Sequence, residues 1–66
     1  MKLYYDEQVD ALYLRFDDST IIESEEVKEG IILDYNNKDQ VVGIEVLGMS
    51  KRIPITELKK LQFEFA

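Results

Sequence analysis

The alternation between residues 11 and 16 limits the possible folds of this 66-residue chain more than any other feature. Every second residue in this stretch is large and apolar. The apolar positions are Leu12, Leu14 and Phe16, and the positions between them are Ala11, Tyr13 and Arg15. This pattern predicts a half-buried β-strand. A short edge strand around residues 2–5 and a polar segment between Asp6 and Asp10 precede it, so we expect a β-hairpin, with both aspartates accepting hydrogen bonds from turn amides.

Three further strands are predicted downstream, at residues 20–27, Ile31–Tyr35 and Val41–Leu47. Turn-forming residues at 17–20 and at Gly30 separate them. The first of the three carries Glu23, Glu25 and Glu26, and alternation sends two of these side chains to one face and one to the other. Such charges discourage edge-to-edge aggregation. Gly43 in the last strand indicates a bulge, a bend or the close approach of another group, and we favour packing over function there.

The polar loop Asn36–Asp39 is the clearest hairpin signal in the chain. An even loop would place Leu33 on the same face as Val42, Ile44 and Val46. An odd loop would turn Asp34 to that face instead. We favour the even loop because it keeps a carboxylate out of the core.

A helix is predicted just after Pro54, because proline disfavours the α conformation in the residue before it. Thr56 is the expected N-cap, and Glu57 suits the positive end of the helix. Residues 61–66 fit either a continued helix or a strand, and we favour a short terminal strand. The predicted fold class is α+β: a five-stranded antiparallel β-meander with a short C-terminal helix packed on its main apolar face, and a sixth strand as an open alternative.

Size and composition predict one small globular domain that spans residues 1–66, since 45% of the chain is hydrophobic and 33% is charged. There is no cysteine or histidine, so disulfides and transition-metal clips are not expected, and self-association is the remaining means of stabilising so small a domain. No stretch has the apolar length of a signal peptide or a membrane span, which favours a cytoplasmic protein. A net charge of −6 argues against nucleic acid and anionic lipid as partners.

One group of residues is a candidate interaction surface, because alternation brings all of them to the sheet face opposite the main core. The members are Tyr13, Arg15, Ile32, Asp34, Gly43 and Glu45. This face is part apolar and part charged, a mixture that suits contact with another protein. An exposed ion pair between Arg15 and a neighbouring acid is the simpler interpretation.

Asp6 and Asp10 are weak candidates for binding a hard cation, and we favour a turn-capping role for both. The glutamates of residues 23–26 are a second weak candidate, since only two of them converge. Catalytic residues are not predicted, because a chain without histidine, cysteine or an activated serine lacks the usual nucleophiles and proton relays. No cofactor is expected.

Several short motifs occur together in order. They are Tyr5-Asp6, Asp10-Ala11-Leu12-Tyr13-Leu14, Gly30-Ile31-Ile32-Leu33-Asp34-Tyr35, Val42-Gly43-Ile44-Glu45-Val46-Leu47 and Ser50-Lys51-Arg52. In this respect the chain, up to about residue 53, resembles domain-of-unknown-function family 2283. Lys38-Asp39 stands where that family often has Asp-Gly. The resemblance implies a small, mostly antiparallel bacterial domain with an added C-terminal element, and it implies no catalytic residues.

Two classes of function follow from these observations. The first is a non-enzymatic protein-interaction module, which could be the acidic neutralising partner of a basic protein such as a toxin. The second is a small carboxylate enzyme or divalent-cation binder that uses Asp6, Asp10, Asp34 and Glu45. We favour the first, and we expect a homodimer built on exposed apolar sheet surface or on a strand edge.

Overall fold

The computed structural model describes all 66 residues as one open antiparallel sheet followed by two short 3₁₀ helices. The strands are β1 (Lys2–Asp6), β2 (Ala11–Arg15), β3 (Glu23–Lys28), β4 (Ile31–Tyr35) and β5 (Val41–Leu47), and the helices are η1 (Met49–Lys51) and η2 (Ile55–Lys60). Five antiparallel strands are as predicted. The fold is mostly β rather than α+β, because neither helix is an α-helix. None of the helices is long and apolar enough to cross a lipid bilayer.

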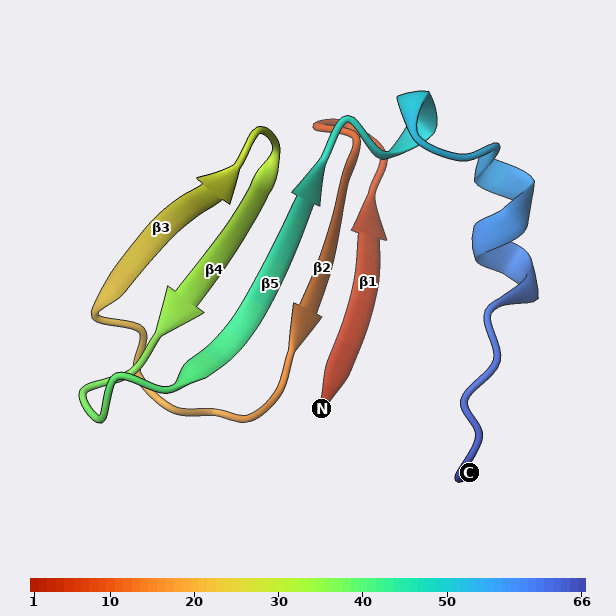
Figure 1. Cartoon of the computed structure of the whole chain (residues 1–66). Coiled ribbons are helices and arrows are strands. Elements are labelled where there is room, and N and C mark those ends of the chain that lie inside the picture. Colours follow the sequence, from red (N-terminus) through yellow and green to blue (C-terminus); the bar gives the residue numbers. More distant parts are fainter.

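The order of the strands is β1-β2-β5-β4-β3, so the predicted meander is wrong (Figure 1). Residues 16–22 do not return beside β2; they cross the end of the sheet, and β3 forms the far edge. Burial explains this order. A strand with three glutamates suits an edge, where its side chains and one row of backbone groups stay in water. The more apolar β5 then takes the central position between β2 and β4.

The β4–β5 hairpin has the predicted faces. Leu33 lies opposite Ile44, and Asp34 lies opposite Gly43 on the other face. The loop between Tyr35 and Val41 nevertheless holds an odd number of residues, 36–40, and a bulge next to Tyr35 restores the register. Inside this loop, Asp39 adopts the left-handed φ of 60° that a glycine would take more easily.

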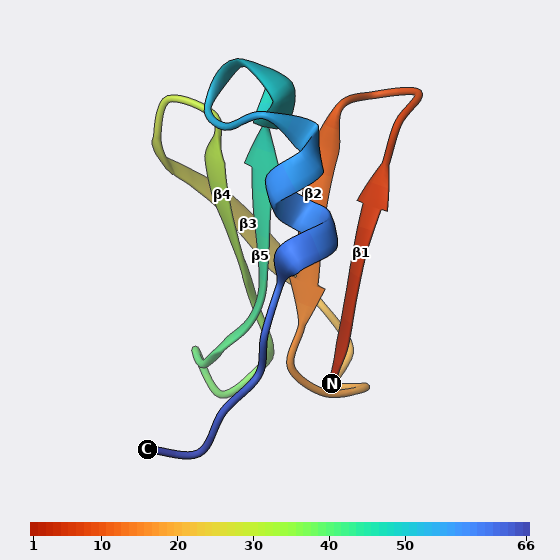
Figure 2. The same cartoon turned by 90° about the vertical axis from the view of Figure 1, so that its right-hand side faces the viewer.

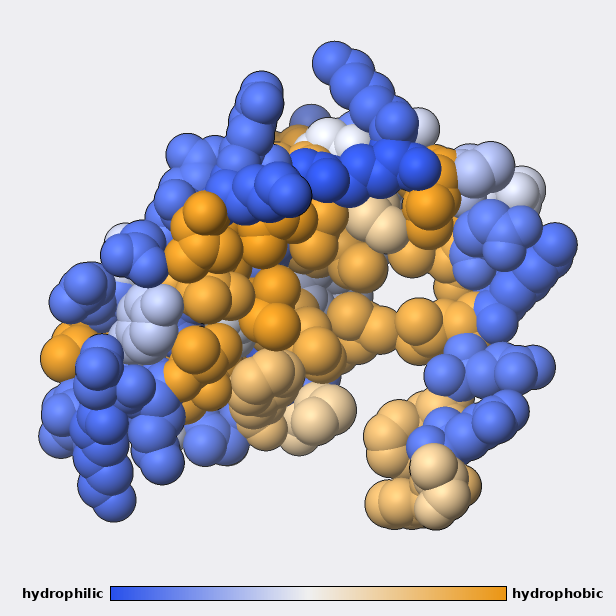
Figure 3. Space-filling view, viewed as in Figure 1, coloured by the Kyte–Doolittle hydropathy of each residue, from blue (hydrophilic) through white to orange (hydrophobic).

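One side of the sheet, here called the apolar face, gathers large aliphatic side chains from four strands. It comprises Leu3, Leu12, Leu14, Ile31, Leu33, Ile44 and Val46. Figure 3 shows this surface as a broad hydrophobic area with polar residues around its rim. None of the seven residues is buried, and no side chain in the chain is less than 2% exposed. The buried hydrophobic residues are only Ala11, Val42 and Met49, so the core is small and the aliphatic side chains of the apolar face remain partly exposed.

Helix η2 does not cover the apolar face, contrary to the prediction. It stands beside β1 at one edge of the sheet, and none of its residues is buried (Figures 1 and 2). Its six residues form a 3₁₀ helix only about 12 Å long, which is too short to cross five strands. Thr56 lies inside the helix and is not its cap; Pro54 occupies that position, without a side-chain hydrogen bond.

The last residues, 61–66, form an extended C-terminal arm rather than a helix or a paired strand. Leu61 ends η2 with φ −56° and ψ 133°, which is an extended conformation. No hydrogen bond joins the arm to the sheet, so the predicted sixth strand is absent. Phe63 and Phe65 are 76% and 92% exposed.

Candidate functional site

The six predicted surface residues do lie together on the face opposite the apolar face, here called the polar face. They occupy two neighbouring cross-strand rows. Arg15, Gly43 and Asp34 follow one another across β2, β5 and β4 in the first row. Tyr13, Glu45 and Ile32 do so in the second. Alternation within each strand was therefore sufficient to group these residues.

Asp34 is the centre of a hydrogen-bond network on the polar face. Its side chain is one of the few buried polar groups, with 6% of the residue exposed. The Tyr13 hydroxyl donates to Oδ2 over 2.6 Å, and the Ser24 hydroxyl donates to Oδ1 over 2.6 Å. Both carboxylate oxygens thus have a partner, as a buried charge requires. The network joins β2, β4 and β3.

Gly43 makes this network possible because it lies between Tyr13 and Asp34 on the intervening strand. A Cβ atom at this position would lie 2.8 Å from Asp34 Oδ2 and 2.9 Å from the Tyr13 hydroxyl oxygen. Both distances are shorter than normal contacts, so a side chain would displace one partner. Of the alternatives predicted for this glycine, close approach of another group is the one that occurs.

The environment of Tyr13 makes its phenol harder to ionise. Burial raises the pKa of the Tyr13 hydroxyl, and the hydrogen bond to Asp34 raises it further. The hydroxyl therefore stays protonated and remains a donor at neutral pH. This favours a structural role for the pair over proton transfer, which needs a pKa nearer the working pH.

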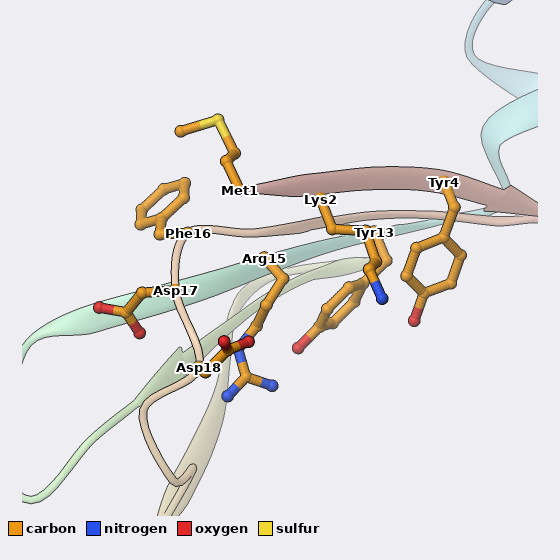
Figure 4. A pocket seen from close by; sticks show the side chains of 8 residues that line it. All are labelled: Met1, Lys2, Tyr4, Tyr13, Arg15, Phe16, Asp17 and Asp18. Atoms are coloured by element: carbon orange, nitrogen blue, oxygen red, sulfur yellow. The ribbon is translucent and has the colours of Figure 1, made fainter.

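A groove of about 480 Å³ opens beside this network at the ends of β1 and β2 (Figure 4). Its lining residues are Met1, Lys2, Tyr4, Tyr13, Arg15, Phe16, Asp17 and Asp18. Sequence reasoning found two of them, Tyr13 and Arg15. The others are Met1, two residues of β1 and three residues of the segment after β2. The register of the β1–β2 hairpin could have identified Lys2 and Tyr4, because Lys2 lies opposite Arg15 and Tyr4 lies opposite Tyr13.

Arg15 does not form the predicted cross-strand ion pair. Its guanidinium donates from Nη2 to the carbonyl oxygen of Ser19, and its buried Nε has no hydrogen-bond partner. Ser19 is held in turn by Asp17, whose Oδ1 accepts a 2.8 Å hydrogen bond from the Ser19 amide. That hydrogen bond lowers the pKa of Asp17 below its ordinary value of 3.8. Arg15 thus anchors the segment that crosses the end of the sheet.

Asp6 and Asp10 accept hydrogen bonds within the β1–β2 hairpin, and Asp10 also accepts hydrogen bonds from η1. Asp6 Oδ1 accepts from the Gln8 amide over 3.0 Å, the predicted turn contact. Asp10 accepts from the Tyr5 hydroxyl at 2.5 Å, and from the amide and hydroxyl of Ser50 at 2.9 and 2.7 Å. Asp10 therefore fastens the hairpin to η1, forty positions further along the chain.

The acidic residues do not converge on a metal site. Nowhere do three or more Asp, Glu, His or Cys side chains gather as possible ligands. The glutamates of β3 alternate as predicted, since Glu25 lies opposite Leu33 on the apolar face and Glu26 lies opposite Ile32 on the polar face. The four carboxylates of the enzyme hypothesis are likewise divided between the β1–β2 turn and the centre of the polar face.

One known protein family matches well over half of the chain. The model of the family described as "Protein of unknown function (DUF2283)" covers residues 2–50 of the 66. The chain belongs to the DUF2283 family. No curated protein and no solved structure matches the chain. The matched region ends within η1, so η2 and the C-terminal arm lie outside it.

The motifs that resemble DUF2283 fix the turns and the polar face of the sheet. Ser50 is the residue that binds Asp10, and Arg52 donates to the carbonyl oxygens of Leu47 and Glu29 at 3.0 and 3.1 Å. Gly43 and Asp34 belong to the network described above. These residues have structural roles here, so the motifs account for the fold of this DUF2283 protein without assigning it a reaction.

Proposed function

We propose that this DUF2283 protein is a non-enzymatic protein-interaction module that acts as a homodimer, with the apolar face as its contact surface. The observation that carries the proposal is the incomplete burial of this face. Seven aliphatic side chains from four strands lie side by side there; Leu3 is exposed, the other six are partly exposed, and none is buried. A contiguous exposed apolar area of this kind is typical of a protein-protein interface.

The surface area of the chain is large enough to supply one side of a stable interface. A folded monomer of 7.7 kDa exposes about 4,300 Å² by the usual scaling with mass. This chain exposes 5355 Å², which is about 1,000 Å² more than that scaling gives. A standard interface removes about 800 Å² from each partner. The excess of one chain is therefore enough for one side of a stable dimer.

A second copy is the occupant that we favour. Twofold pairing uses the same surface of both chains, so a single contact region satisfies both. The centre of the apolar face carries no charged residue, and the charges of the molecule lie around its rim (Figure 3). Two acidic chains can therefore approach through this face with their charges kept towards solvent. The dimer also supplies the stabilisation that a domain with no disulfide and a small core needs.

Substitutions on the two faces of the sheet test this proposal. Ile44→Lys places a charge in the middle of the apolar face, and Ile32→Lys places the same charge on the polar face as a matched control. We expect Ile44→Lys to weaken dimerisation by about a hundredfold or more, because a central interface position is fully desolvated. Ile32→Lys should leave the dimer intact. Circular dichroism checks that both variants are folded, and equal dimerisation by both would overturn the proposed surface.

A basic protein is a second candidate partner, because the β3 edge offers it a separate site. All six residues of β3 are exposed, and Glu23, Glu25 and Glu26 lie along an unpaired strand edge. An extended basic segment could pair with this edge and neutralise its charge. Titration with a Lys-rich peptide tests this: binding that Glu23→Gln and Glu25→Gln together abolish would support it. No binding at low salt would exclude it.

We place this function in the cytosol. A chain without cysteine can form no disulfides, so it has no need of an oxidising compartment. Expression of the tagged protein followed by cell fractionation checks this placement.

A further inference from the structure

The C-terminal arm is the most apolar part of the molecule that has no partner. Leu61, Phe63 and Phe65 alternate with Gln62 and Glu64, a pattern typical of a chain that buries one side. The rings of Phe63 and Phe65 contact each other edge to face, with centroids 5.2 Å apart. Both remain largely exposed. Exposed phenylalanines in an unpaired terminal segment are costly unless another surface covers them.

The arm leaves the sheet on the apolar side. Leu58 of η2 and Leu61 line a hollow together with residues of β1 and β2. These apolar side chains keep η2 beside the β1 edge of the sheet. Beyond Leu61 the arm turns away from the strands, and in Figure 2 it runs down from η2 and ends to the left of the strands. Figure 3 shows an open gap between the arm and the sheet. The arm therefore does not cover its own apolar face; it enters the space in front of it.

We propose that the arm is a reciprocal clasp, in which Phe63 and Phe65 of each chain pack on the apolar face of a second copy. The inference rests on the proposed homodimer and adds the residues that close it. Five extended residues, 62–66, reach about 17 Å, enough to cross three or four strands of a facing sheet. Each chain brings one arm and one uncovered face, so a twofold pair satisfies both. Burial of arm and face together removes the excess surface.

Removal of the arm tests whether it contributes to the dimer. The truncated variant ends at Leu61, and Phe63→Ser with Phe65→Ser is a second variant that keeps the full length. Glu64→Ser is the matched control, since it changes the polar side of the same segment. We expect the first two to weaken dimerisation at least tenfold, because two phenylalanine anchors are lost, and the control to be unchanged. Sedimentation equilibrium measures the dissociation constants.

Disulfide cross-linking tests whether the arm binds in the second copy. The chain has no cysteine, so introduced pairs are unambiguous. One chain carries Phe65→Cys, and a second, with a tag that changes its mass, carries one of Leu14→Cys, Leu33→Cys or Ile44→Cys. Under mild oxidation we expect a covalent heterodimer with at least one of these positions. A chain that carries both substitutions should give a covalent two-chain species.

The outcomes separate this inference from the proposed function. A truncated chain that dimerises as tightly as the full chain would overturn the clasp and leave the homodimer in place. Internal cross-links at the mass of one chain, with none between chains, would show that the arm folds back on its own sheet and would also overturn the clasp. A full-length chain that is monomeric would overturn both proposals.

Discussion

Tyr13 and Asp34 are joined by a 2.6 Å hydrogen bond although their strands are not neighbours in the sheet. The bond passes over Gly43 of β5, the strand between them, and it exists because that residue has no side chain. Ser24 completes the contact from β3. One buried carboxylate thus connects three strands, β2, β4 and β3, and the missing side chain at Gly43 leaves the space in which Tyr13 reaches it.

Tyr13→Phe should destabilise the fold by about 1–3 kcal/mol, because the buried Asp34 carboxylate would lose one of its two donors. Urea denaturation followed by circular dichroism measures the change. Tyr4→Phe is the control, since the Tyr4 ring lies 5.5 Å from that of Tyr13 on the same face but its hydroxyl makes no hydrogen bond. Equal losses in the two variants would show that the Tyr13–Asp34 bond has no special weight.

Gly43→Ala should cost about 1–3 kcal/mol, because its Cβ would crowd both Asp34 and the Tyr13 hydroxyl. The same hydrogen bond is lost in Tyr13→Phe, so the two changes should not add. We expect the double variant to lose less stability than the sum of the single variants. A strictly additive double variant in the same denaturation assay would mean that Gly43 acts independently of the network.

The Tyr5–Asp10 hydrogen bond should make stability depend on pH at both ends of the scale. It raises the pKa of Tyr5 from 10.0 to about 12. The folded state therefore favours the neutral phenol, and this contribution is full below pH 10 and lost as the pH rises through about 12. The same bond lowers the pKa of Asp10 below 3.8, so the contribution of Asp10 is full above that pH and lost as the pH falls through the lower folded value.

Tyr5→Phe should flatten the alkaline part of this profile. We expect the wild-type chain to lose more stability than the variant between pH 10 and pH 12. Other tyrosines ionise in both proteins, so the difference between the two urea profiles isolates Tyr5. Parallel losses over this range would mean that the bond to Asp10 does not hold the phenol in its neutral form.

Salt should strengthen the homodimer. Each chain carries a net charge of −6, so two copies repel one another while their apolar faces attract. Screening within about 10 Å at 0.1 M salt weakens the repulsion and leaves the apolar contact in place. We expect a dissociation constant a few-fold lower at 0.5 M than at 0.05 M sodium chloride. Binding of a basic partner at the β3 edge should weaken with salt. Weaker self-association at high salt would count against an apolar interface.

Alternation predicted the strands and the two faces of the sheet well, because successive side chains of a strand point to opposite faces whatever the order of the strands. It grouped Tyr13 with Asp34 and placed Leu33 beside Ile44 without any knowledge of strand order. The order itself depends on a competition between strands. The glutamates of β3 assign that strand to an edge, but which strand then pairs with β2 is decided by tertiary burial, which local pattern does not report.

The site was predictable as a face and not as a network. Ser24 was missed because the neighbouring glutamates dominate that strand, and its hydroxyl gains importance only once it lies opposite Asp34. The C-terminal helix was predicted to cover the apolar face. The sequence alone gives no indication that this helix, with apolar residues at Ile55 and Leu58, remains at the edge of the sheet instead. Its few residues bury too little surface to hold it over the centre.

The mass of the chain in solution is the measurement that tests the homodimer most directly. Light scattering on a size-exclusion column, repeated from micromolar to millimolar loading, gives that mass at each concentration. We expect twice the chain mass of 7.7 kDa, with dissociation only at the lowest loadings. A mass of one chain throughout this range would contradict the homodimer and leave the apolar face to a different protein.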